Sequence, residues 1–221
     1  MNNELQSELK KEFQLERMIL FSDAVFAIAI TLLVIEIKVP EITREFASEN
    51  KLIESLAHMV PKFTGFLISF MIIGLYWTVH HRMFGFVVNY NQRLLWLNLI
   101  FLLAVVLMPF STAFWSEYIY LFLKSPLIIY VSNICFLGFM NFFLWKYISN
   151  TKHKLTAGLS KPVAGYFAFR AIMIPVIFII MALVYFFVDK KYAVWIPPFI
   201  PVIMSVIARR YKKKLNIQVH K

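Results

Sequence analysis

Long apolar runs separated by short polar segments dominate the chain. The runs cover residues 17–37, 59–79, 94–114, 126–145, 163–188 and 193–208. An α-helix rises about 1.5 Å per residue, so about 20 apolar residues cross the roughly 30 Å hydrocarbon core of a bilayer. The pattern predicts an all-α integral membrane protein with six transmembrane helices. The last run is short and begins with several prolines, so we expect its helix to be tilted or kinked.

Composition and charge agree with a membrane protein and predict its orientation. The chain is 60% hydrophobic and only 16% charged, which is too apolar for a soluble domain of 221 residues. Its net charge of +11 does not indicate nucleic-acid binding, because the basic residues lie between and after the apolar runs. The segments on the side of the N-terminus carry more than twice as many Lys and Arg as the other side. The positive-inside rule therefore predicts that both termini are cytoplasmic.

The same pattern predicts one membrane domain with short polar ends. We expect residues 1–16 to form a cytoplasmic N-terminal segment, residues 17–208 a single six-helix transmembrane domain, and residues 209–221 a basic cytoplasmic tail. The single cysteine, Cys135, excludes an intramolecular disulfide, and no Cys/His cluster indicates a metal site. We therefore expect no metal and no cofactor.

The first apolar run carries an acidic residue at membrane depth. Asp23 is followed by about a dozen uncharged residues, and burying its carboxylate in a bilayer costs about 2.5 to 3.5 kcal/mol. On a helical wheel Ile28, Thr31 and Ile35 share one face, with Leu32 at its margin, while Asp23 and Ser22 point elsewhere. This Ile/Thr stripe faces either lipid, a packed helix or an aqueous path.

The second run offers partners for Asp23. Trp77 and His81 are four residues apart, so they lie on one helical face, at the same membrane depth as Asp23. An indole or imidazole N–H would satisfy the buried carboxylate. A proton relay through Asp23 and His81 is the functional alternative, because Asp and His chains carry protons in pumps.

The sequence lacks the signatures of several other functions. It has no TVGYG-like filter segment, so any ion selectivity must come from side chains. It has no GxSxG motif, and hydrolytic catalysis is not expected. A membrane-embedded redox enzyme using His80 or His81 is a further alternative, although no second histidine is placed on a facing helix.

Three segments of the first half resemble a known family. The first run contains Arg17-x-x-x-Phe21-Ser22-Asp23, the second contains Trp77-x-x-His80-His81, and the third contains Asn98 with Met108-Pro109-Phe110. These elements resemble those of the transmembrane protein 175 family of potassium channels. The later runs match that family mainly in number and hydrophobicity.

The resemblance implies a homotetramer in the cell membrane in which the first helix of each subunit lines a central pore. It implies a potassium-permeable leak channel, with K⁺ as permeant ion and no bound cofactor. The constriction would be formed by side chains, namely Ile28, Thr31, Ile35 and Leu32. A second set would fix the pore helix from behind, namely Arg17, Phe21, Ser22, Asp23, Trp77 and His81. A proton-coupled carrier or proton-conducting protein using Asp23 and His81 stays as the alternative.

Overall fold

The computed structural model describes residues 2–43, 48–121, 123–193 and 196–215, and these parts of the chain are helical apart from short connections. The α-helices are α1 (Asn2–Ile35), α2 (Glu49–His58), α3 (Val60–Phe84), α4 (Gln92–Val106), α5 (Met108–Tyr118), α6 (Lys124–Ile148), α7 (Lys161–Phe187), α8 (Lys190–Ala193) and α9 (Ile200–Leu215). Short 3₁₀ turns lie at Ile119–Leu121 (η2), Thr151–His153 (η3) and Pro197–Phe199 (η4). The expected all-α fold is confirmed.

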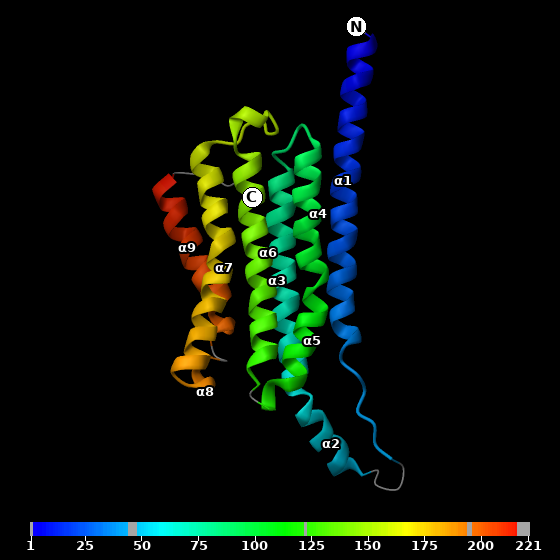
Figure 1. The fold of residues 1–221 in the computed structure, drawn as a ribbon, viewed down its shortest axis with the longest axis vertical. Helices are drawn as coiled ribbons and strands as arrows, with labels where there is room; N and C mark the ends of the chain where they lie inside the picture. The colour runs from blue at the N-terminus through cyan, green and yellow to red at the C-terminus, as the bar shows by residue number, and fades with distance from the viewer. Residues whose placement is uncertain (1, 44–47, 122, 194–195, 216–221) are drawn as a thin grey trace.

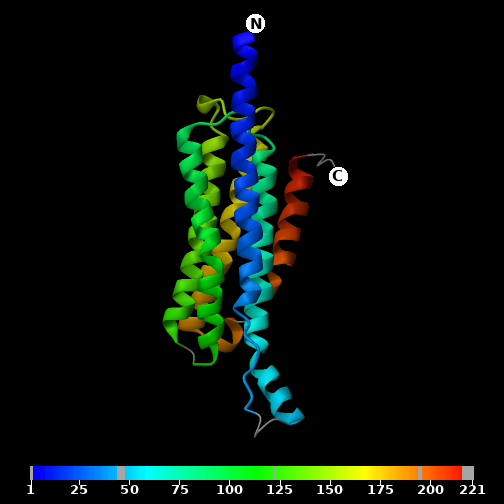
Figure 2. The same cartoon turned by 90° about the vertical axis from the view of Figure 1, so that its right-hand side faces the viewer.

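The long helices form an up-and-down bundle (Figure 1). α6 packs against α4, α5 and α7, while α1 lies at one edge against α3, α4 and α5, and α9 lies at the other edge against α7. The start of α1 and the end of α9 lie at the same end of the bundle (Figure 2). α1 also extends past the other helices at that end, so residues 2–16 are helical and continuous with the first membrane helix.

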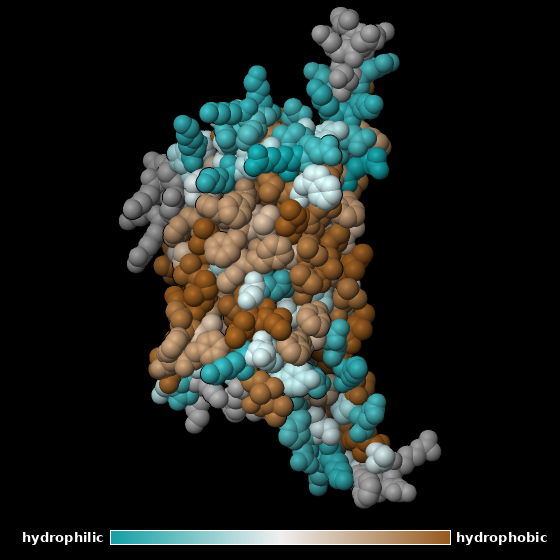
Figure 3. Space-filling model, viewed as in Figure 1, coloured by the Kyte–Doolittle hydropathy of each residue, from teal (hydrophilic) through white to brown (hydrophobic). Residues whose placement is uncertain are grey.

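Five helical segments of the described chain are long and apolar enough to cross a membrane. They are Glu8–Ile35, Val60–Phe84, Gln92–Tyr118, Lys124–Ile148 and Lys161–Phe187. On the face shown in Figure 3, an apolar belt lies between two polar ends. The first five expected spans therefore correspond to helices of the right length.

The sixth expected span, residues 193–208, differs from the prediction. The chain there forms the end of α8, the turn η4 and then α9, which starts only at Ile200. Proline has no N–H and clashes with the preceding turn, which explains the late start. α9 continues into the expected tail as far as Leu215, and residues 194–195 and 216–221 lie outside the described part of the chain.

The third span is interrupted between α4 and α5. Asn91 caps its first turn, because the Asn91 side chain accepts a hydrogen bond from the N–H of Leu94 at 2.8 Å. Pro109 stands in the first turn of α5 and cannot donate to the carbonyl of Val105. The span therefore consists of two helical pieces joined at Leu107.

α6 and α7 cross closely at Gly138 and Pro175. A Cβ atom on Gly138 would lie 2.0 Å from Cγ of Pro175, so only glycine fits. Pro175 also leaves the carbonyl of Ala171 without its helical donor. The hydroxyl of Tyr76, from α3, donates to that carbonyl at 3.4 Å. Two neighbours therefore accommodate Pro175: Gly138 leaves room for its ring, and the Tyr76 hydroxyl bonds the carbonyl that it leaves free.

A buried cluster of hydroxyl groups joins α3, α5 and α6. Thr112 donates to the Ser69 hydroxyl at 2.7 Å, and the hydroxyls of Ser69 and Tyr130 lie 2.9 Å apart. All three residues are buried. Paired hydroxyls connect membrane helices without leaving polar groups in contact with lipid.

Candidate ion pathway and its supporting network

α1 has two faces of different character. Its buried face, which meets the rest of the subunit, consists of Leu15, Met18, Ser22, Phe26, Ala29 and Leu33. The opposite face carries Ile28 and Ile35, which are 58% and 67% exposed, and Leu32, which is 39% exposed. A long stretch of the membrane helix is therefore left uncovered by the rest of the chain.

Thr31 lies within the exposed stripe. Its hydroxyl donates to the carbonyl of Ile28 at 2.8 Å, one turn back on the same helix. This bond satisfies the hydroxyl proton and leaves oxygen lone pairs available on the exposed side. The stripe thus offers two apolar positions and, between them, an oxygen that can accept a hydrogen bond or face a cation.

Asp23 lies on the border between the two faces and is partly exposed. Trp77, on α3, donates its indole N–H to Oδ1 of Asp23 at 2.9 Å. The ring of His81 lies 5.8 Å from that of Trp77, and His81 is exposed. The structure brings these three residues together, and their role in holding α1 stays a prediction.

Ser22 belongs to a second, fully buried network. Its hydroxyl donates to the carbonyl of Met18 at 2.8 Å and accepts a hydrogen bond from Nδ2 of Asn98, on α4, at 2.9 Å. Oδ1 of Asn98 lies 2.8 Å from Nε2 of His80, on α3. Because an amide oxygen only accepts, Nε2 of His80 carries the hydrogen in this bond. One asparagine therefore joins α1, α4 and α3.

Sequence reasoning did not place His80 in this network. His80 is 1% exposed, and its ring stacks on Phe101 at 5.4 Å with an interplanar angle of 4°. His80 shares a helical face with Tyr76, four residues earlier, and both are buried, but no feature of the sequence distinguishes this face from that of His81. His81 is on the adjacent face, which turns outward.

Arg17 and Phe21 lie apart from both networks. The guanidinium of Arg17 lies 5.8 Å from the ring centre of Phe13, one turn earlier on α1. Phe21 is 52% exposed on the open side of the helix. Within one subunit these two residues contact no other helix through a described polar bond, so their expected function in fixing α1 stays a prediction.

No group of three or more His, Cys, Asp or Glu residues in the described part of the chain is arranged to hold a metal ion. A narrow pocket near the C-terminal end of α1 is lined by Leu33, Glu36, Lys62 and neighbouring residues of α5. The feature of α1 that remains to be explained is its exposed stripe.

Comparison with known proteins identifies the family. A family model described as the endosomal/lysosomal potassium channel TMEM175 matches residues 17–109, from Arg17 of α1 to Pro109 of α5. A protein of Streptomyces collinus named as a potassium channel is 33% identical over 146 residues, which cover 65% of this chain and 69% of that protein. A chicken protein named as the endosomal/lysosomal proton channel TMEM175 is 33% identical over 115 residues, covering 50% of this chain but 23% of that protein.

A solved structure extends the likeness to the later helices. The crystal structure of a lysosomal potassium-selective channel TMEM175 homolog from Chamaesiphon minutus superposes with a TM-score of 0.71 at 27% identity, covering 90% of this chain and 98% of that one. The likeness therefore includes α6 and α7, which lie beyond the family-model match. The chain belongs to the TMEM175 family of potassium channels, which are multi-pass membrane proteins and not enzymes.

Proposed function

We propose that four copies of this chain form a potassium-permeable leak channel of the cell membrane, with the exposed stripe of α1 lining a central pore. The observation that carries the proposal is the placement of Asp23 on the open border of a membrane helix. A carboxylate there would face lipid in a single subunit, at a cost of about 2.5 to 3.5 kcal/mol. Neighbouring copies and a water-filled inner pore remove that cost.

Symmetry explains how one helix face forms a whole pore wall. In a ring with fourfold symmetry each residue of the stripe is repeated four times around the axis. Ile28 then forms the main apolar ring, Thr31 a ring of hydroxyls, and Ile35 with Leu32 a second apolar ring toward the outside. Arg17, Phe21 and the Ser22–Asp23 pair hold the inner end of the pore helix.

Such a pore selects without a backbone filter. An apolar ring narrow enough to remove part of an ion's hydration shell favours the cation that loses water more easily, which is K⁺ over Na⁺. The same ring closes by dewetting when it narrows slightly. Selectivity from a single apolar ring is modest, because no oxygen ligands replace the lost water at that level.

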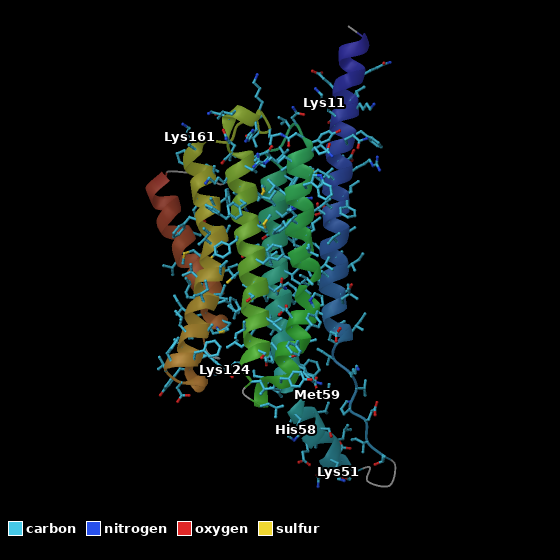
Figure 4. The ribbon with its side chains drawn as sticks, in the orientation of Figure 1. Lys11, Lys51, His58, Met59, Lys124 and Lys161 are labelled. Atoms are coloured by element: carbon cyan, nitrogen blue, oxygen red, sulfur yellow. The ribbon has the colours of Figure 1, made fainter. Side chains whose placement is uncertain are left out.

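The proposal includes six spans per subunit with cytoplasmic termini. The start of α1 and the end of α9 lie at the same end of the bundle, which requires an even number of crossings (Figures 1 and 2). Lys11 and Lys161 lie at that end, and Lys51 and Lys124 lie at the other (Figure 4). Over the whole sequence the segments on the side of the termini carry more than twice as many Lys and Arg, in agreement with the positive-inside rule. α9 has 16 residues, or about 24 Å, and it completes the sixth crossing together with η4.

Flux measurements test the pore. Ile28→Asn, assayed in proteoliposomes, is expected to raise K⁺ flux and to lower discrimination against Na⁺ several-fold, because a polar ring stays wet and replaces part of the lost hydration. Val34→Asn is the matched control: Val34 is also exposed on α1, but it lies about 120° around the helix from Ile28. If both variants behave like the parent protein, Ile28 does not form the constriction.

A proton-coupled carrier or proton-conducting protein is the second candidate, and the name of the chicken relative, a proton channel, favours proton conduction. Asp23 and His81 are the titratable groups near the inner end of the stripe. The two functions separate in the same vesicles. Electrogenic K⁺ uptake that persists without a pH gradient supports the potassium channel. K⁺ uptake that saturates, exchanges with protons and disappears in Asp23→Asn contradicts it and supports a carrier.

A further inference from the structure

A groove on the far side of α3 from α5 is not used by the pore. It has a volume of about 370 Å³ and is bounded by α3, α7 and α9. Its walls are almost entirely aliphatic, with Leu67 and Met71 from α3 and Ile200 and Met204 from α9. Pockets of this size hold small apolar ligands or single chains. Its walls belong to helices of the membrane bundle, so the apolar molecules available to it are lipids.

One charged side chain lines this apolar groove. Arg170, on α7, has a guanidinium 3.5 Å from the hydroxyl of Tyr166 and 5.7 Å from its ring centre. Nε of Arg170 is buried and has no hydrogen-bond partner. Among the described residues no carboxylate lies within ion-pair distance of Arg170. Arg170 is half-buried, and a partly buried cation without an anion is unfavourable, so the groove is complementary to a negatively charged ligand.

The depth of Arg170 fits the head group of a lipid. α7 has 27 residues and is about 40 Å long, so about 5 Å of it extends beyond the hydrocarbon core at each end. Arg170 reaches back to Tyr166, one turn nearer the start of α7. This places its guanidinium within a few ångströms of the hydrocarbon edge, where arginine side chains extend toward lipid phosphates.

A second cation stands at the same end of the groove. Arg209 is exposed on α9 and directly follows Ala208, which lines the groove beside Arg170. The sequence continues with Lys212, Lys213 and Lys214. Basic side chains at the cytoplasmic edge of a membrane helix attract anionic lipids.

We infer that the groove between α3, α7 and α9 binds one anionic phospholipid of the cytoplasmic leaflet. One acyl chain lies along the aliphatic walls, and the phosphate pairs with Arg170 and is attracted by Arg209. The choice of leaflet rests on the proposed orientation, whereas the binding itself requires only that the bundle lies in a membrane. Bound lipid fills the space beneath α9 and so fixes this helix against α3 and α7.

Native mass spectrometry tests the inference. The purified full-length protein is exposed to an equimolar mixture of phosphatidylglycerol and phosphatidylcholine, and the lipids retained per subunit are counted. The parent protein is expected to retain at least ten times as much phosphatidylglycerol as phosphatidylcholine. Arg170→Gln is expected to remove most of that preference. Arg93→Gln is the matched control, because Arg93 lies on α4 over the ring of Tyr147 and not on the groove.

A second pair of variants fills the groove without changing charge. Leu67→Trp and Ser205→Phe both enlarge a lining side chain, and each is expected to reduce retention of both lipids at least fivefold. Leu67 is 59% exposed, so its replacement leaves the packed core intact. An unchanged preference in Arg170→Gln, or unchanged retention in Leu67→Trp, overturns the inference. K⁺ flux in the same preparations reports on the pore separately, so failure of one proposal does not imply failure of the other.

Discussion

Asn98 is the residue whose loss should loosen the attachment of α1 most directly. It accepts from His80 and donates to Ser22, and the three residues are almost fully buried. Asn98→Leu keeps a side chain of similar size but removes both bonds. Nε2–H of His80 is then left without an acceptor in an apolar environment.

The expected cost follows from the bonds lost. An unsatisfied buried donor costs about 1 to 3 kcal/mol, and a hydrogen bond between membrane helices contributes about 0.6 kcal/mol. Asn98→Leu should therefore lower the free energy of unfolding by about 2 to 3 kcal/mol. In a chain of this size that corresponds to a decrease in Tm of about 4 to 12 °C.

A double-mutant cycle separates this network from general packing. His80→Phe keeps an aromatic ring against Phe101 but removes the polar nitrogen. When His80→Phe is combined with Asn98→Leu, the buried N–H donor of His80 is no longer present. The double variant should therefore be about 1 to 2 kcal/mol more stable than the sum of the two single effects predicts. The assay is thermal unfolding of the purified protein followed by size-exclusion chromatography.

Two results would refute this reasoning about Asn98. One is a decrease in Tm of less than about 2 °C in Asn98→Leu, and the other is strict additivity in the double variant. Asn50→Leu is the control, since Asn50 is exposed on α2 and its replacement should change Tm little.

Two further predictions concern the crossing of α6 and α7. Gly138→Ala should destabilise the protein by several kcal/mol, because the new Cβ would lie 2.0 Å from Pro175; normal yield and Tm of Gly138→Ala would contradict the close approach. Tyr76→Phe should cost about 1 kcal/mol, since it leaves the carbonyl of Ala171 without a donor. In a Pro175→Ala background the N–H of residue 175 can bond the carbonyl of Ala171, so Tyr76→Phe should have almost no effect on Tm. An equal effect of Tyr76→Phe in both backgrounds would exclude this role for the hydroxyl.

The positions of the first five spans could be predicted from the sequence because hydrophobicity over about 20 residues is a strong signal. The exposure of Ile28 and Ile35 also followed from helical periodicity, since polar side chains in a membrane helix turn toward other helices. For the division of the third span at Leu107, the only sequence signal was Pro109. A proline predicts a kink, but it does not predict how far the two helical pieces separate.

The sequence could not identify which histidine meets Asn98. His80 and His81 are adjacent, and a helical wheel gives the angle between them without saying which face meets α4. That choice depends on how α3 is rotated in the bundle, and this rotation is set by packing of many residues distant in sequence. The late start of α9 depends in the same way on tertiary contacts, because its prolines permit several starting points.

α1 is attached to the rest of the chain by different interactions along its length. Among the described residues, its side-chain hydrogen bonds to other helices come from Ser22 and Asp23, whereas Ala29 and Leu33 hold the outer half only by packing. The helix is therefore held by hydrogen bonds at the level of Ser22 and Asp23 and only by packing beyond it. Ile28 lies about 9 Å and Ile35 about 20 Å beyond Ser22 along the axis. A tilt of about 5° around the level of Ser22 would move Ile28 by roughly 0.8 Å and Ile35 by roughly 1.7 Å. In the proposed pore, such a tilt would change the width of the apolar rings by amounts comparable to the radius of a dehydrated ion.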